Sequence, residues 1–160
     1  MRFQTALNEG VYLTDTSESV LVVDDEQISR NILVKIVQRE GYEAEEAADG
    51  AEALAKLKDR RFDYVISDIK MPNMDGMQLL KEVKTHHPSV SVLLVTGQVQ
   101  TINPRDAIAA GADSLILKPF KNVEIARTLA KLSNIRKRTG RRNLRPKTQP
   151  PGPSDPAEKT

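Results

Sequence analysis

The feature of this sequence that most limits its fold is a fivefold alternation of short apolar runs with helical apolar patterns. Four of the five runs are rich in Val, Ile and Leu, which is typical of strands buried on both faces of a sheet. Each run is followed by apolar residues three or four positions apart, the spacing of one helix face. The sequence therefore predicts an α/β fold, a doubly wound five-stranded parallel sheet with right-handed crossovers. The expected strands are 20–23, 42–46, 64–66, 90–95 and 114–117.

Local signals place the helix ends. Gly41 ends the first helical pattern, because glycine readily takes the left-handed conformation that closes a helix. Pro88 disfavours helix in the residue before it, so the third helix should end at His86 or His87. Asn103 and Pro104 form a cap and a first-turn residue, and they predict the start of the fourth helix.

Composition limits the chain to one folded unit. It has 160 residues, of which 39% are hydrophobic, enough for one core with tails. It contains no cysteine, which excludes disulfides and thiolate metal sites and fits a cytoplasmic protein. No apolar run approaches the roughly 20 residues of a membrane span. We therefore expect a cytoplasmic protein without membrane contact.

Charge divides the chain into a domain and a tail. Residues 134–160 hold eight of the 24 Lys and Arg residues but two of the 22 acids. We expect a flexible extension at 1–18, a folded domain at 19–135 and a basic, Pro-containing disordered tail at 136–160. The basic segment 136–147 is interpreted as solvated, with contact to nucleic acid through phosphate charge as the alternative.

Four apolar strands end in residues that carry chemistry. Asp24 and Asp25 follow the first strand, Asp68 the third, Thr96 the fourth and Lys118 the fifth. Because parallel strands point the same way, these side chains should meet at one crevice at the sheet edge. The sequence therefore predicts three carboxylates, a hydroxyl and an ammonium in one site.

This set of groups suits phosphoryl transfer. Three neighbouring carboxylates repel one another unless cations compensate them. Lys118 supplies one positive charge, and a hard divalent ion with oxygen ligands, most simply Mg²⁺, supplies the rest. One carboxylate oxygen can then act as a nucleophile, and the product would be an aspartyl phosphate.

Four motifs together resemble the receiver domain of two-component response regulators. They lie at 21–26 (LVVDDE), 67–76 (SDIKMPNMDG), 95–97 (VTG) and 111–120 (GADSLILKPF), and the resemblance covers about 19–135. It implies a flavodoxin-like fold with strand order 2-1-3-4-5.

The resemblance also implies roles for single residues. Asp68 corresponds to the phosphoacceptor. Asp25 and Asp68 would bind Mg²⁺ directly with the backbone carbonyl of Lys70, and Asp24 would bind it through water. Lys118 would pair with the phosphoryl group.

Further roles concern switching and lifetime. Thr96 would bond a phosphoryl oxygen and start the switch, and Pro119 would follow a cis peptide. Lys70 and Gln98 would modulate the lifetime of the aspartyl phosphate, because they flank the path of attacking water. The family usually has Tyr or Phe where this chain has Leu115, so the usual route of output is altered.

These expectations amount to a single-domain response regulator. A sensor histidine kinase or phosphotransfer protein would be the donor. The chain would be a phosphoacceptor rather than an enzyme, although it would assist its own phosphorylation and dephosphorylation. The output would pass in trans to a protein bound by the face made of the fourth helix, the strand 114–117 and the last helix.

Two alternatives stay open at this point, and a third is disfavoured. A pseudo-receiver scaffold would keep the fold without the chemistry, and a regulator associated with DNA would use the basic tail. A haloacid-dehalogenase-like phosphatase is disfavoured, because such enzymes carry Asp-x-Asp after the first strand. His86 and His87 lie at a helix end, which favours positive charge, so we do not assign them to a metal site.

Overall fold

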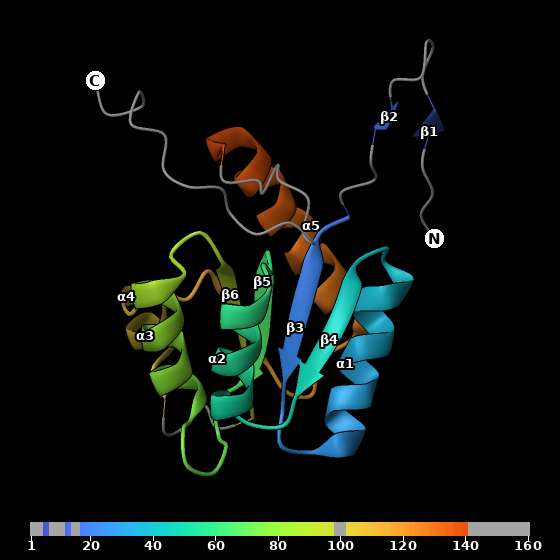
Figure 1. The fold of residues 1–160 in the computed structure, drawn as a ribbon. Helices are drawn as coiled ribbons and strands as arrows, with labels where there is room; N and C mark the ends of the chain where they lie inside the picture. The colour runs from blue at the N-terminus through green and yellow to red at the C-terminus, as the bar shows by residue number, and fades with distance from the viewer. Residues whose placement is uncertain (1–4, 7–11, 14–16, 98–101, 141–160) are drawn as a thin grey trace, which may run out of the picture.

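Strands and helices alternate along the folded part of the chain (Figure 1). The computed structural model describes residues 5–6, 12–13, 17–97 and 102–140. The main sheet consists of β3 (Ser19–Val23), β4 (Glu43–Ala47), β5 (Tyr64–Asp68), β6 (Ser91–Thr96) and β7 (Ser114–Leu117). The helices are α1 (Gln27–Arg39), α2 (Gly50–Asp59), α3 (Gly76–His86), α4 (Pro104–Ala109) and α5 (Asn122–Thr139).

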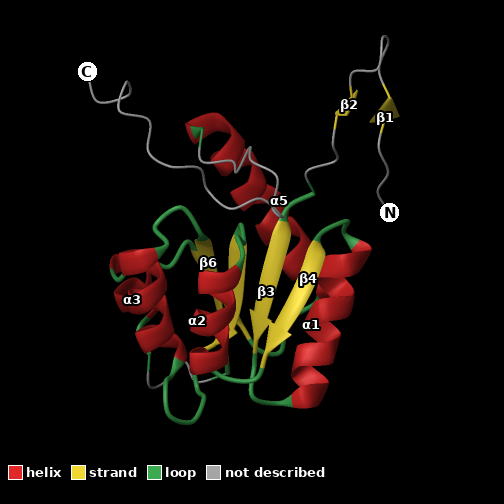
Figure 2. Ribbon diagram, in the orientation of Figure 1, coloured by secondary structure: helices red, strands yellow, loops and turns green. Residues whose placement is uncertain are grey.

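The sheet has the predicted order and polarity. Its strands run β4-β3-β5-β6-β7 and all neighbouring pairs are parallel (Figure 2). When the five strands are numbered in the order of the chain, the order across the sheet is 2-1-3-4-5, so the predicted flavodoxin-like fold is confirmed. A separate antiparallel pair, β1 (Thr5–Ala6) and β2 (Tyr12–Leu13), lies in the segment before the sheet.

The two faces of the sheet form two apolar clusters. Val20 and Val22 of β3 face the cluster that α1 and α5 complete, whereas Leu21 and Val23 face the cluster of α2, α3 and α4. All four side chains are fully buried. Burying one such aliphatic side chain is worth about 1.5–3 kcal/mol. The continuous aliphatic runs of the sequence therefore reflect burial on both faces.

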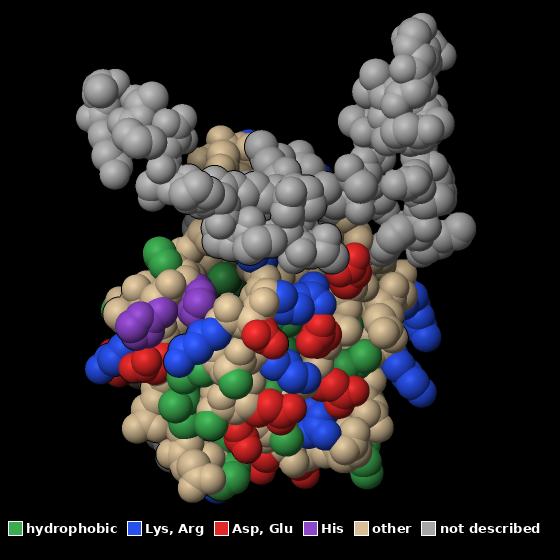
Figure 3. Space-filling view, viewed as in Figure 1, with side chains coloured by type: hydrophobic (Ala, Val, Ile, Leu, Met, Phe, Trp, Pro, Cys, Tyr) green, Lys and Arg blue, Asp and Glu red, His purple; other side chains and the backbone are tan. Residues whose placement is uncertain are grey.

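Strand β4, one of the two edge strands of the sheet, has a weaker apolar pattern. Its acids are balanced by bases from α2 and the residue after it, and acidic and basic side chains are interspersed on this face (Figure 3). Arg60 pairs with both Glu43 and Glu45, and its guanidinium stacks on Phe62 at 4.5 Å from the ring centroid. Lys56 reaches Glu45 at 3.9 Å. Charged side chains on an edge strand discourage pairing with other chains.

Helix boundaries follow the predicted signals. Gly41 follows the end of α1 with φ of 94°, a left-handed conformation that favours glycine. Asn103 caps α4 by accepting a bond from the backbone of Arg105. Asp75 and Gln78 form a reciprocal capping box at the start of α3. No helix in the described part of the chain is both long and apolar enough to cross a membrane.

Helix α5 runs past residue 136, where the tail was predicted to begin. The helix continues to Thr139, and Arg136 is 1% exposed. Arg136 donates to Asp63 at 3.2 Å and to the carbonyl of Ser89 at 2.5 Å. A basic residue in a basic run was interpreted as solvated, but helical periodicity turns Arg136 inward.

The start of the domain is also earlier than predicted. Glu18, assigned to the extension 1–18, accepts hydrogen bonds from the Tyr64 hydroxyl at 2.9 Å and the Ser133 hydroxyl at 2.7 Å. Its carboxylate lies 3.7 Å from Arg136. Glu18 therefore belongs to a buried polar network at the amino-terminal ends of the strands. Most of the extension, and the tail beyond Gly140, lie outside the described residues.

Candidate functional site

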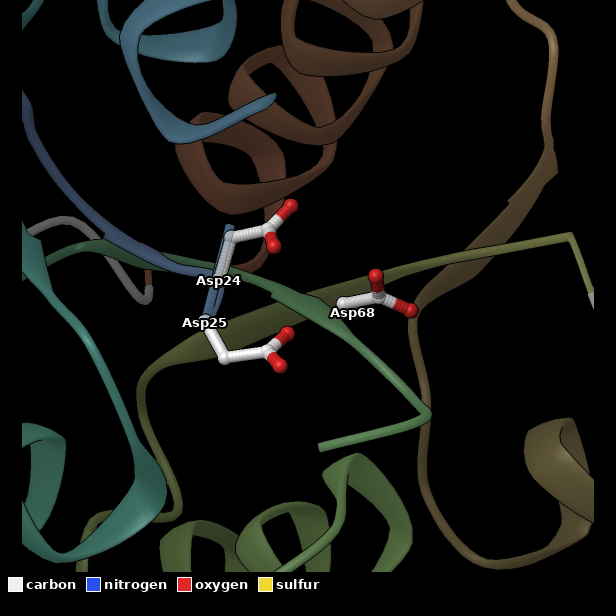
Figure 4. A group of neighbouring side chains, drawn as sticks. All are labelled: Asp24, Asp25 and Asp68. Atoms are coloured by element: carbon white, nitrogen blue, oxygen red, sulfur yellow. The ribbon is translucent and has the colours of Figure 1, made fainter. Parts of the chain in front are cut away.

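Three carboxylates meet at the carboxyl-terminal edge of the sheet. Asp24 and Asp25 follow β3, and Asp68 is the last residue of β5, the neighbouring strand. Carboxylate oxygens of the three lie within 4.8 Å of one another (Figure 4). Asp24 is fully buried and Asp25 is exposed. The sheet polarity thus brings together the acids that the sequence singled out.

Lys118 supplies the positive charge of the site. Its Nζ lies 2.9 Å from Oδ2 of Asp68, 3.7 Å from Oδ2 of Asp24 and 3.4 Å from the hydroxyl of Ser29. Burial alone would lower the pKa of Lys118, but the hydrogen bond and charge of Asp68, with the charges of Asp24 and Glu26, raise it. Lys118 is therefore protonated at neutral pH, and it compensates one of the three carboxylates.

Thr96 ends β6, the strand next to β5. It is buried, and its carbonyl accepts a bond from the backbone of Lys118 at 2.8 Å. This backbone bond joins the ends of β6 and β7, so two of the predicted site residues are held side by side.

Asp24 retains one carboxylate oxygen for a ligand. Its Oδ1 accepts a bond from the backbone of Glu26 at 2.9 Å. Its Oδ2 is buried and has no hydrogen-bond partner among the described residues. Burial raises the pKa of Asp24, and the negative charge of Asp68 adds to this, against the opposing effects of the Glu26 backbone and Lys118. A buried oxygen without a donor, beside two further carboxylates, fits a hard divalent cation.

The loop after Asp68 folds back tightly on the strand. A Cβ at Gly76 would collide with the carbonyl oxygen of Asp68, so a larger residue there would displace the strand end. Gly76 donates to the carbonyl of Ile69 at 2.7 Å, and Asn73 takes the left-handed conformation with φ of 68°. The backbone N–H of Lys70 donates to Oδ1 of Asp68 at 3.3 Å. The spacing of this motif therefore reflects how the loop is held against the acid.

Two residues at this edge were not singled out from the sequence. Ser29 lies beside Lys118, and Arg30 donates to the carbonyl of Asp24 at 2.6 Å. Arg30 had a signal in the sequence, because it falls on the apolar stripe of α1 with Leu33 and Val37. A charged residue in such a stripe must find a partner when buried.

The two histidines do not join the site. His86 is the last residue of α3, and its ring lies 3.5 Å from Glu82 on the same helix. Burial, His86 and Lys58 lower the pKa of His87. Both rings lie on the surface beside α3 (Figure 3), whereas the site lies near the start of that helix.

A family model for the response regulator receiver domain matches residues 20–130. The chain belongs to the response regulator receiver family. It is 37% identical over 115 residues to the chemotaxis protein CheY of Thermotoga maritima, covering 71% of this chain and 96% of that protein. It is 36% identical over 111 residues to the transcriptional regulatory protein ZraR of Klebsiella oxytoca, covering 69% of this chain but 25% of ZraR.

Solved receiver domains share the fold. The CheY-like receiver domain protein of Methanospirillum hungatei JF-1 superposes with a TM-score of 0.74 at 30% identity, covering 78% of this chain and 100% of that one. The response regulator TrrA of Thermotoga maritima, solved in complex with Mg²⁺-BeF, gives 0.64 at 32% identity, covering 72% and 98%.

Three further residues were singled out from the sequence, and two of them lie in the described part of this receiver domain. The Lys118–Pro119 peptide bond is cis, as the resemblance implied. Leu115, which stands where the family usually has an aromatic residue, is partly buried against the apolar cluster of α2, α3 and α4. Gln98 lies outside the described residues.

Proposed function

We propose that this receiver domain accepts a phosphoryl group on Asp68 from a histidine kinase or phosphotransfer protein, in a Mg²⁺-dependent reaction. The observation that carries the proposal is the setting of the Asp68 carboxylate, which has Lys118 on one oxygen and two further carboxylates beside it. The complex of TrrA with Mg²⁺-BeF supports it, because TrrA shares this fold.

The chain's own residues suit both the cation and the transfer. Asp25, Asp68 and the carbonyl of Lys70 would hold Mg²⁺, and Asp24 would hold it through water. When bound, Mg²⁺ supplies positive charge to the carboxylates and to the oxygens of the transferring group. An Asp68 oxygen forms the new bond to phosphorus as the bond to the donor histidine nitrogen breaks, and the electron pair stays on that nitrogen.

After transfer the charge at Asp68 changes. A phosphoryl group carries about 1.5–2 negative charges at neutral pH. Lys118 would then pair with a phosphoryl oxygen, and the hydroxyl of Thr96 would donate to another. Lys70 and Gln98 would set how easily water reaches the phosphorus. Leu115 would repack when Thr96 moves.

The output surface that we propose is the α4–β7–α5 face, acting on a protein in trans. Ile108 of α4 and Leu117 of β7 are 50% and 46% exposed, so this face offers apolar side chains to a partner. Coupling between the two sites is expected at about 1–3 kcal/mol, as in other switch proteins. We propose that the domain acts in the cytoplasm.

Labelling with a small phosphodonor such as acetyl phosphate tests the chemistry. The wild-type domain should be labelled only with Mg²⁺, and Asp68→Asn should abolish labelling. Asp75→Asn is the matched control, because Asn also caps helices and Asp75 lies outside the acid cluster. Labelling of Asp68→Asn at the wild-type level would contradict the assignment of Asp68 as the phosphoacceptor. A wild-type domain that neither labels nor binds Mg²⁺ would be a scaffold.

A further inference from the structure

Asp24 has four polar groups, and three of them are hydrogen-bonded. Its backbone N–H donates to the carbonyl of Ala47 at 3.2 Å, and its Oδ1 accepts from the backbone of Glu26 at 2.9 Å. Its carbonyl accepts from Nη1 of Arg30 at 2.6 Å. Only Oδ2 is left without a hydrogen bond within the described part of the chain. Three groups of Asp24 are thus fixed, and the fourth is available to a ligand.

Arg30 is the side chain that holds the backbone of Asp24, whereas Lys118 and Ser29 act on its carboxylate. Arg30 is 8% exposed and uses three nitrogens on three partners. Besides the Asp24 carbonyl, Nε donates to Oε1 of Glu46 at 2.7 Å, and Nη2 donates to Oε1 of Gln27 at 2.7 Å. A planar guanidinium can hold three acceptors in one geometry, whereas a lysine ammonium on a flexible stem cannot.

The partners of Arg30 come from three elements. Asp24 follows β3, Glu46 is in β4 and Gln27 is the first residue of α1. Glu46 and Gln27 are not members of the acid cluster. Their hydrogen bonds therefore fix the position of the Arg30 guanidinium. The chain from β3 into α1, which carries both Asp24 and Asp25, is therefore held at the carbonyl of Asp24.

We propose that Arg30 is a positioning residue that fixes the Asp24–Asp25 segment so that its carboxylates face a divalent cation. The inference rests on the proposed function, because it assigns Mg²⁺ to the acid cluster. Arg30 itself touches neither the cation nor the phosphoryl group. Hydrogen-bonded partners behind metal ligands commonly change metal affinity by about 10–100-fold when they are lost.

The experiment measures Mg²⁺ binding to the whole chain by calorimetry and by amide chemical shifts of Asp25 and Glu26. The variants are Arg30→Lys, which keeps the charge, and Arg30→Met, which removes it. Both should weaken Mg²⁺ binding by about tenfold or more. On charge alone, Arg30→Met would bind a cation more tightly, so a loss of affinity in both variants identifies geometry as the cause.

Two controls separate positioning from general destabilisation. Val37→Ala removes buried apolar volume from the same helix, away from the site. It should lower stability but leave Mg²⁺ affinity unchanged. Glu46→Gln keeps an acceptor for Nε and should weaken binding by no more than about threefold, as expected for a retained hydrogen bond.

Labelling by acetyl phosphate gives a second readout. The Mg²⁺ concentration that gives half the maximal rate should rise about tenfold in both Arg30 variants, in step with affinity. The maximal rate at saturating Mg²⁺ should stay near that of the wild type. A structural role alone would lower the maximal rate through loss of folded protein instead.

Two results would overturn the proposal. One is Mg²⁺ affinity within twofold of the wild type in both Arg30 variants. The other is an equal loss of affinity in Val37→Ala. An unlabelled wild-type domain that still binds Mg²⁺ would overturn the proposed function alone, because its titrations still report on Arg30. A wild-type domain that binds no Mg²⁺ would overturn both proposals.

Discussion

Buried charge occurs at both ends of the sheet, and the two ends balance it differently. At the carboxyl-terminal edge, three carboxylates share one ammonium, and an oxygen of Asp24 has no donor among the described residues. At the opposite end, the guanidinium of Arg136 lies among the carboxylates of Asp63 and Glu18 and hydroxyl and carbonyl partners. The first cluster has an excess of negative charge that a ligand can compensate. In the second, one guanidinium faces two carboxylates; Oε2 of Glu18 also lacks a hydrogen bond among the described residues, but it lies 3.7 Å from Arg136. The excess of negative charge therefore distinguishes the first cluster as a binding site from the second as an anchor.

The largest expected effect comes from breaking the anchor with Arg136→Met. Removing one partner of a buried ion pair leaves the other charge uncompensated and costs about 3–5 kcal/mol. Urea unfolding would measure this loss, and Mg²⁺ affinity should not change. The double variant Asp63→Asn with Arg136→Met should recover much of the loss. A shift below about 1 kcal/mol, typical of exposed pairs, would contradict the assignment of Arg136 as an anchor.

The next largest expected effect is the stabilisation of the folded domain when Mg²⁺ compensates the negative charge of the acid cluster. Mg²⁺ at a hundred times its dissociation constant should stabilise the folded domain by about 2.7 kcal/mol, because it binds the native state alone. Asp25→Asn should lose most of this gain, whereas Arg136→Met should keep it. Urea unfolding with and without Mg²⁺ decides the matter. An equal gain in wild type and Asp25→Asn would place the ion elsewhere.

The acid cluster should also give a pH dependence in the absence of divalent ions. Burial raises the pKa of Asp24 above its ordinary value of 3.8. The folded state therefore holds the proton to higher pH than the unfolded chain, and stability falls as pH rises between the unfolded and the folded pKa. Asp24→Asn should remove this contribution. Unfolding free energies of the wild type and of Asp24→Asn would be measured at increasing pH from 3.8, with a chelator present. As pH rises, the wild type should lose stability relative to the variant. A difference independent of pH would refute the burial effect.

The smallest effect tests a single bond of the anchor. Burial raises the pKa of the Tyr64 phenol, and the charge of Glu18 adds to this against the opposing hydrogen bond of Ser133. The hydroxyl therefore stays protonated and donates to Glu18. Tyr64→Phe removes that donor and should cost about 0.5–1.5 kcal/mol. Phosphorylation by acetyl phosphate should be unaffected. A change in labelling rate would show that the two ends of the sheet are coupled.

Much of this structure could be predicted from sequence because the signals were local. Aliphatic runs, helix spacing and capping residues lie within a few positions of the elements that they define. The convergence of Asp24, Asp68 and Lys118 needed only the shared direction of parallel strands. The strand order and the cis bond before Pro119 came from family resemblance, since no local pattern specifies either.

The sequence did not reveal the buried charges that hold these elements. Arg30 finds Glu46 sixteen positions away, and Arg136 finds Asp63 seventy-three positions away. Their pairing depends on which helix packs on which strand, and that is known only after folding. Charged residues on helices are mostly solvated, so Arg136 in a run of basic residues was assigned to the tail.

The position of Arg136 matters for anyone who divides this protein into parts. A domain cut at residue 135, where the change in composition suggests a junction, would leave Asp63 without its guanidinium and Glu18 without its neighbour. Fusions and domain exchanges should therefore keep residues 18–139 intact. A module trimmed to residues 19–135 would carry the complete acid cluster on a weakened scaffold, and a loss of Mg²⁺ binding in it could be mistaken for a defect of the cluster itself.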